Sequence, residues 1–202
     1  STAAIASYPF LSCQQEPIDV ANSWGVFKEI YCAGNDSVFI FLENIFDEII
    51  PLFPSKRIHI GGDEAPKSRW EKCKKCQMRM QQNNLANEHE LQSYFIERIR
   101  KILSRKNREI IGWDEILESH IYSPISIQSW RGVSGGINAV KQGKKAIMSP
   151  TSHCYFDYDI NSIDLEKVFS FNPMGENLDS SEKKLIIGCL LYTSPSPRDR
   201  IA

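Results

Sequence analysis

The feature that most constrains the fold is an alternation of short apolar runs with longer segments of helical periodicity. Apolar residues recur at helical spacing over 38–49, which Pro51 ends, and again over 88–105. Short strand-like runs lie at 58–60, 109–112, 125–128 and 146–149. Strands that alternate with helices pair in parallel, so the sequence predicts an α/β fold. This alternation alone does not distinguish a (β/α)8 barrel from an open, doubly wound sheet.

The sequence predicts several further elements. We expect helices over 68–82 and 135–142, and another that begins at Asp114 and Glu115. Asp114 is expected to be the N-cap of that helix. A loop is expected over 162–182, where Pro173 and Gly175 interrupt regular structure, before a last strand at 184–188.

Composition places the chain among ordinary globular proteins. Its 202 residues are 42% hydrophobic and 24% charged, which suffices for one domain with a sizeable core. A net charge of -1 gives no reason to expect nucleic acid or an anionic membrane surface as partner. No apolar run approaches the roughly 20 residues needed to cross a bilayer, so no membrane span is expected.

Two adjacent carboxylates, Asp63 and Glu64, follow the strand-like run 58–60 directly after two glycines. Reactive groups collect at the carboxyl ends of parallel strands, and glycines allow substrate or backbone to approach closely. Each carboxylate disfavours ionisation of the other, which can keep a Glu protonated as a proton donor. The alternative is a solvated acidic turn that opens the next helix and complements its dipole.

Aromatic and polar residues also follow the next three strands. Trp113, Trp130, and Tyr155 with Asp157 stand at the same ends of successive strands. Sugar faces pack on aromatic rings while sugar hydroxyls need hydrogen-bonding partners, so the group predicts a carbohydrate-binding wall. The alternative for each aromatic residue taken singly is packing in the core.

The six cysteines are scattered, and only Cys73 and Cys76 have the spacing of a metal or redox pair. No second Cys-x-x-Cys or His pair completes four ligands in the sequence. We therefore expect this pair to lie in an exposed loop or to have a local structural role, and we expect no metal. A metal or redox protein organised by the pair is the alternative.

Four motifs occur in an order that resembles the family 20 glycoside hydrolases, the β-N-acetylhexosaminidases. They are His59-Ile60-Gly61-Gly62-Asp63-Glu64, Gly112-Trp113-Asp114-Glu115, Ser129-Trp130 and Tyr155-Phe156-Asp157. The segments 3–9, 24–28 and 53–56 are also similar to that family, and the resemblance covers residues 1–190. It implies an incomplete (β/α)8 TIM barrel, of roughly strands 4 to 8.

The resemblance implies removal of terminal non-reducing β-linked N-acetylglucosamine or N-acetylgalactosamine by substrate-assisted retaining catalysis. Glu64 would be the general acid and base, and Asp63 would hold the acetamido nitrogen. Tyr155 would orient the acetamido oxygen. Trp113 and Trp130 would enclose the acetamido methyl group. Asp157 would contact the sugar hydroxyls or the neighbouring loop.

No metal or organic cofactor is implied, because the nucleophile belongs to the substrate. The implied partner is a glycan or glycoconjugate with a terminal N-acetylhexosamine, which favours an exported enzyme. His59 is expected to be an interior histidine rather than a substrate contact. A non-catalytic carbohydrate-binding barrel is the alternative function, although the presence of both Asp63 and Glu64 weighs against it.

The chain departs from the family pattern at both ends. It begins at Ser1, where the family would have completed its third strand, and residues 191–202 form a Ser/Pro/Arg stretch without periodicity. We interpret 191–202 as a non-native tail and 1–190 as part of the catalytic barrel. A barrel that lacks strands exposes edges and core, so we expect the isolated chain to aggregate or to hydrolyse nothing measurable.

Overall fold

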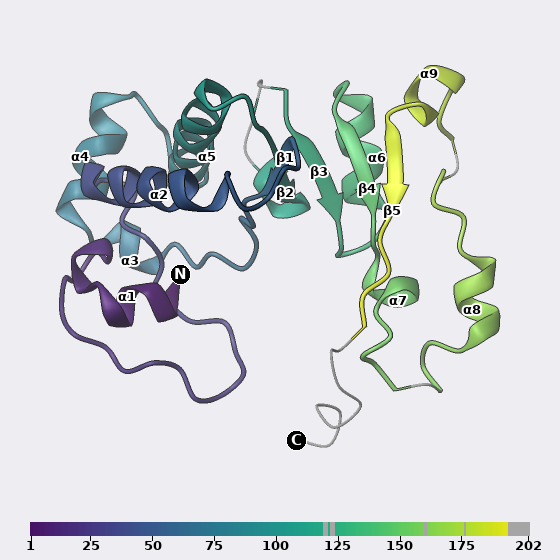
Figure 1. Ribbon diagram of the computed structural model, residues 1–202, viewed down its shortest axis with the longest axis horizontal. Coiled ribbons are helices and arrows are strands. Elements are labelled where there is room, and N and C mark those ends of the chain that lie inside the picture. The colour runs from purple at the N-terminus through teal and green to yellow at the C-terminus, as the bar shows by residue number, and fades with distance from the viewer. Residues whose placement is uncertain (119–120, 122–123, 160, 176, 194–202) are drawn as a thin grey trace. The chain divides into compact units, whose positions relative to one another are not determined.

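The computed structural model describes residues 1–118, 121, 124–159, 161–175 and 177–193 (Figure 1). The chain divides into two compact units, and each is described by itself. Unit 1 comprises Ser1–Ile58, Gly62–Glu109 and Glu118–Ser123, and unit 2 comprises His59–Gly61, Ile110–Leu117 and Pro124–Ala202. Among the described residues, none of the helices combines the length and apolar character that a membrane crossing requires.

The described strands form one sheet in the order β1-β2-β3-β4-β5. Their bounds are Arg57–His59 (β1), Glu109–Trp113 (β2), Ser126–Ser129 (β3), Lys145–Met148 (β4) and Ile186–Cys189 (β5). The pairs β2–β3, β3–β4 and β4–β5 are parallel. Strand order therefore follows chain order, and the predicted parallel α/β sheet is confirmed.

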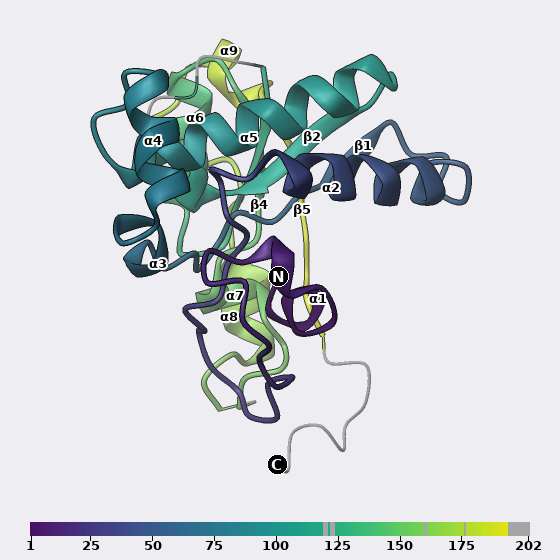
Figure 2. The same ribbon diagram turned by 90° about the vertical axis from the view of Figure 1, so that its left-hand side faces the viewer.

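Unit 1 is mainly helical. Its helices are α1 (Thr2–Ser7), η1 (Pro9–Leu11), α2 (Asp36–Ile49), α3 (Ser68–Glu71), α4 (Lys74–Gln82) and α5 (Glu88–Arg105). Figure 2 shows α2 and α5 side by side, and they are in contact. The side chains of Asn35 and Asn87 cap α2 and α5 by accepting backbone N–H groups of the first turn.

The predicted helix over 68–82 is two helices, which is a correction to the sequence analysis. Cys73 separates α3 from α4, and its ψ of 114° is extended. Cys73 is itself the N-cap of α4, and it belongs to the hydrophobic core of unit 1. Other members of that core include Ile5, Leu11, Val38 and Leu91. The helical path is interrupted at Cys73 because the extended backbone of this buried residue does not continue the α3 helix.

The helices of unit 2 are short. They are η2 (Asp114–Glu118, whose last residue belongs to unit 1), α6 (Ser134–Lys141), α7 (Thr151–Cys154), α8 (Leu165–Ser170) and α9 (Ser180–Lys183). Helix α6 packs against β3 and β4 (Figure 1). Val140 of α6, Ile127 of β3 and Met148 of β4 are buried. This packing fixes the ends of β3 and β4.

The predicted loop over 162–182 is wrong in part, because α8 and α9 lie within it. Asp164 accepts a hydrogen bond from the backbone N–H of Lys167 at the start of α8. Asp179 and Glu182 form a reciprocal capping box at the start of α9. Local side-chain capping therefore stabilises one or two helical turns that are too short to show hydrophobic periodicity.

Candidate active site

The loop after β1 has an unusual backbone. Gly61, Gly62 and Glu64 have φ angles of 73°, 97° and 43°, all in the left-handed region. A residue with a side chain in that region costs about 1–3 kcal/mol, and such residues cluster at functional sites. The next helix, α3, begins only at Ser68, so the alternative of an acidic turn that opens a helix is wrong.

Two side chains of unit 1 hold this loop. Gln92 of α5 is buried, and its Nε2 donates to the carbonyl of Gly62 over 2.8 Å. The ammonium of Lys67 donates to the carbonyl of Ala65 over 2.7 Å. Between these anchors Glu64 is exposed. Sequence reasoning missed Gln92, for which the available signal was a polar residue on the buried face of an amphipathic helix.

Two of the predicted aromatic residues lie together in unit 2. The rings of Trp113, at the end of β2, and Trp130, just after β3, have centroids 6.5 Å apart at 70°. The ring of His59 lies 4.7 Å from that of Trp113, and its Nδ1 accepts from the N–H of Gly61 over 3.1 Å. His59 is exposed, so the prediction of an interior histidine is wrong. The three rings form a continuous aromatic surface.

Acidic residues after β2 hold the segment after β3. Trp130 donates through its indole Nε1 to Glu115 over 2.8 Å and through its backbone N–H to Asp114 over 3.3 Å. The Nε of Arg131 donates to Asp114 over 3.0 Å. The parallel register that pairs Trp113 with Gln128 brings these segments together.

The predicted N-cap role of Asp114 is therefore wrong. Asp114 is the first residue of η2, and its side chain is only 4% exposed. Its carboxylate accepts hydrogen bonds from the segment after β3 instead. Glu115 and Arg131, which sequence reasoning did not select, complete this arrangement. The hydrogen bonds to Asp114 and Glu115 hold Trp130 in position.

Burial raises the pKa of Glu115, and the hydrogen bond from Trp130 opposes this rise. Because the folded pKa lies above the unfolded one, the stability contributed by this group is present below pH 4.5 and is lost as pH rises through the folded pKa. Glu115→Gln keeps an acceptor oxygen and removes the buried charge. We expect its thermal unfolding midpoint to exceed that of the unmodified protein at pH 7 and to converge with it in acid. A difference independent of pH would contradict this assignment.

Tyr155 follows α7 and lies in an aromatic group of its own. Its ring centroid lies 6.3 Å from that of Tyr158 and 5.2 Å from that of Tyr192. The backbone carbonyl of Tyr192 accepts a hydrogen bond from the N–H of Phe156, and the N–H of Tyr192 donates to the carbonyl of Cys154. Tyr192 belongs to the predicted tail 191–202, of which 194–202 lie outside the described residues. The boundary at residue 190 stays a prediction.

Asp157 carries a buried oxygen. Its Oδ1 makes no hydrogen bond to any described residue. Leaving a buried polar atom unpaired costs about 1–3 kcal/mol, and more when it is charged. This oxygen has the geometry of an acceptor that could take a hydrogen bond, and the predicted contact of Asp157 with a sugar hydroxyl stays a prediction. Asp63 and Glu64 belong to unit 1, whereas Trp113, Trp130, Tyr155 and Asp157 belong to unit 2.

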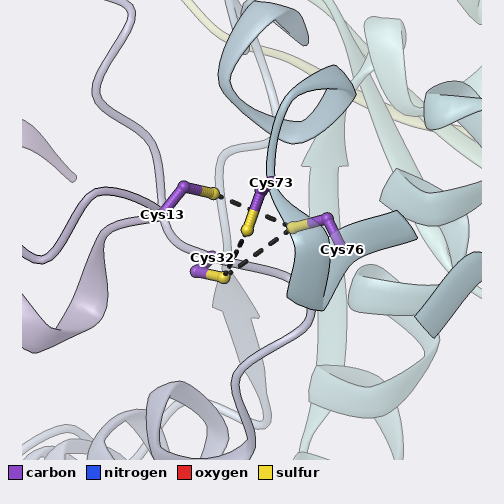
Figure 3. A group of neighbouring side chains, drawn as sticks. All are labelled: Cys13, Cys32, Cys73 and Cys76. Carbon is purple, nitrogen blue, oxygen red and sulfur yellow. Dashed lines mark hydrogen bonds between the residues drawn. The ribbon is translucent and has the colours of Figure 1, made fainter. Parts of the chain in front are cut away.

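Four cysteines of unit 1 converge (Figure 3). The sulfur atoms of Cys13, Cys32, Cys73 and Cys76 all lie within 4.8 Å of one another. Cys73 and Cys76 are buried, so the expected exposed loop is wrong. A hydrogen bond from the Cys13 thiol, together with those from its neighbours, lowers the pKa of Cys32, and the same contact raises the pKa of Cys13.

Comparisons with known proteins agree with the motifs. The family described as "Glycosyl hydrolase family 20, catalytic domain" matches residues 1–190. The chain is 41% identical to a Beta-hexosaminidase of Porphyromonas gingivalis, over 95% of this chain and 27% of that protein. It thus spans less than a third of the length of that relative.

Solved structures match over the same partial length. The Flavobacterium johnsoniae chitobiase has a TM-score of 0.84 and 28% identity, over 95% of this chain and 30% of its own. The Vibrio harveyi exo β-N-acetylglucosaminidase, solved in complex with N-acetylglucosamine, has a TM-score of 0.79 and 25% identity, over 94% and 32%. The predicted incomplete TIM barrel is confirmed as a partial match to this fold. The chain belongs to glycosyl hydrolase family 20, as part of its catalytic domain.

Proposed function

We propose that the protein containing this chain removes terminal β-linked N-acetylhexosamine by substrate-assisted retaining hydrolysis. The observation that carries the proposal is the carboxylate pair Asp63–Glu64, held after two left-handed glycines with Glu64 itself at positive φ. The names of the Porphyromonas relative and of the Vibrio structure support the same substrate class. Glycans and glycoconjugates that carry this sugar at an end are the proposed substrates, and an exported location suits them.

In the first step, the carbonyl oxygen of the substrate's acetamido group attacks the anomeric carbon as the glycosidic C–O bond breaks. The Glu64 carboxyl group donates its proton to the leaving oxygen. Asp63 accepts a hydrogen bond from the acetamido N–H, and its negative charge stabilises the oxazolinium ion that forms. Adjacent carboxylates suit this division, because one is needed protonated and the other ionised.

In the second step, a water molecule attacks the anomeric carbon from the face that the leaving group vacated. Glu64, now ionised, takes a proton from this water, and the ring of the oxazolinium ion opens to restore the acetamido group. Two inversions at the anomeric carbon give net retention. Glu64 returns to its protonated state, so no further acid or cofactor is required.

The proposed contacts with the sugar come from four further residues. Trp113 and Trp130 meet edge to face and offer ring surfaces to the acetamido methyl group. The hydroxyl group of Tyr155 donates to the acetamido oxygen and orients it for attack. The buried Oδ1 of Asp157 accepts from a sugar hydroxyl, which supplies the hydrogen bond that this oxygen otherwise lacks among the described residues.

The test compares two aryl glycosides that differ only at the sugar 2-position. We expect the full-length protein to release the phenol from an aryl β-N-acetylglucosaminide and to leave the matching aryl β-glucoside intact, because the glucoside has no internal nucleophile. Comparable hydrolysis of both substrates would contradict the substrate-assisted route. Binding of N-acetylglucosamine without hydrolysis of either substrate would favour the carbohydrate-binding barrel.

A further inference from the structure

The spacing of the four converging sulfur atoms matches a tetrahedral metal site. A Zn–S bond is about 2.3 Å, so the sulfurs of a regular tetrahedron around zinc lie about 3.8 Å apart. The measured separations are 3.8 Å for Cys13–Cys76, 3.7 Å for Cys32–Cys73 and 3.7 Å for Cys32–Cys76 (Figure 3). A disulfide would require a separation of about 2.05 Å.

The first two cysteines are brought together by a short backbone pairing. Ser12 and Tyr31 form an antiparallel bridge, and the N–H of Cys32 donates to the carbonyl of Leu11 over 2.8 Å. Cys13 and Cys32 each directly follow a residue of the bridge, so they lie on neighbouring segments, on opposite sides of it. The 18 residues between them, 14–31, contain no helix or strand apart from this bridge.

The second two cysteines stand at the start of α4, a helix of nine residues. Cys73 is its N-cap and Cys76 lies in its first turn. Gly34, two residues after Cys32, approaches this turn closely. A Cβ placed on Gly34 would lie 2.5 Å from the backbone N of Cys76 and closer still to the carbonyl of Lys75. The absence of a side chain at Gly34 thus allows the two cysteine-bearing segments to meet.

Burial and charge also suit a metal. Cys32 and Cys76 are 0% exposed and Cys73 is 8% exposed, and all three belong to the hydrophobic core of unit 1. The proposed glycosidase chemistry uses none of these thiols. Four thiolates around Zn²⁺ carry a net charge of -2, which the lysines that flank the pair in sequence, Lys72, Lys74 and Lys75, can offset.

We propose that Cys13, Cys32, Cys73 and Cys76 bind one Zn²⁺ in a structural site. On binding, the four thiols lose their protons and four Zn–S bonds form, without any change of oxidation state. With four protein ligands the site has no open position for substrate, so its role is to fix both ends of the segment 14–31 to the start of α4. The proposal does not depend on the glycosidase function.

The test begins with the metal content of the full-length protein, purified under reducing conditions without chelators. We expect Cys32→Ser to lose one equivalent of zinc relative to the unmodified protein. Cys189→Ser is the matched control: Cys189 lies 3.8 Å from Cys154 in unit 2 and is not one of the four clustered cysteines, so this variant should keep all the zinc. X-ray absorption should report four sulfur ligands at about 2.3 Å.

Two further measurements keep the proposal testable if Cys32→Ser does not fold. Co²⁺ exchanged into the unmodified protein should give thiolate-to-metal charge-transfer bands and the visible bands of a tetrahedral ion. Peptide mass spectrometry under non-reducing conditions should find the four thiols unbridged. Disulfides among these cysteines, iron in place of zinc, or reduced protein that binds neither Zn²⁺ nor Co²⁺ would each overturn the assignment. None of these readouts depends on glycosidase activity.

Discussion

Glu64→Gln is expected to lower kcat of the full-length protein on an aryl β-N-acetylglucosaminide by about 10²–10⁴-fold. The amide keeps the size of the side chain but does not donate an acidic proton to the leaving oxygen. Glu64 is exposed, and its loop is held through the backbone by Gln92, so the fold should tolerate the change. Affinity for N-acetylglucosamine and the thermal unfolding midpoint should stay close to those of the unmodified protein.

The size of this loss should depend on the leaving group. A phenol with a low pKa departs with little help from an acid, whereas the sugar alcohol released from a disaccharide needs a full proton. Glu64→Gln should therefore reduce disaccharide hydrolysis more than aryl glycoside hydrolysis. The control is Glu48→Gln, which changes an exposed carboxylate of α2 and should leave both rates unchanged. Because the second step is the same for both substrates, the comparison uses kcat/KM, and equal losses of kcat/KM on both would show that Glu64 does not act as the proton donor.

Gly34→Ala is expected to lower the free energy of unfolding by about 1–3 kcal/mol or more. The added Cβ would overlap backbone atoms of Lys75 and Cys76, which cannot move aside as the end of a flexible side chain can. Relief of the overlap must separate the two cysteine-bearing segments. Urea unfolding of the full-length protein measures the loss, and zinc content should fall in parallel if the metal proposal holds.

Gly188→Ala is the matched control for this effect. Gly188 lies in β5, and a Cβ there would meet nothing within 4 Å. Its replacement should change the free energy of unfolding little, since strand positions tolerate alanine better than glycine. If Gly34→Ala proved as stable as Gly188→Ala, the turn at the start of α4 would have to relax freely, and the close approach would have no structural importance.

Sequence periodicity predicted the elements that are long or buried. The bounds of α5 agree with the predicted 88–105, because a long amphipathic helix has an unambiguous period. The division of 68–82 at Cys73 was missed, because an inward-facing cysteine does not disturb a helical pattern. Helices α8 and α9 were missed because capping, rather than periodicity, stabilises them.

In the candidate site, too, residues that are adjacent in sequence could be predicted, whereas contacts between distant segments could not. Asp63 and Glu64 were selected as candidates because the glycines and carboxylates are adjacent in sequence. The contacts of Asp114 with Trp130 and Arg131 depend on the register of β2 and β3, which a sequence pattern does not specify. Cys13 and Cys32 were not joined to Cys73 and Cys76, because the bridge at Ser12 and the close approach of Gly34 to the start of α4 are tertiary contacts that the sequence does not show.

The segment 14–31 lies between Cys13 and Cys32, which hold its two ends close to the start of α4. Its residues are mostly exposed, and Trp24 is 97% exposed. When the two ends of a loop are fixed, doubling its length adds only about 0.6 kcal/mol of closure entropy. Insertions and deletions in this segment should therefore be tolerated while the core beneath it stays intact. The exposed part of this segment can thus change in length and sequence while Ile30, at its end, stays in the core of unit 1.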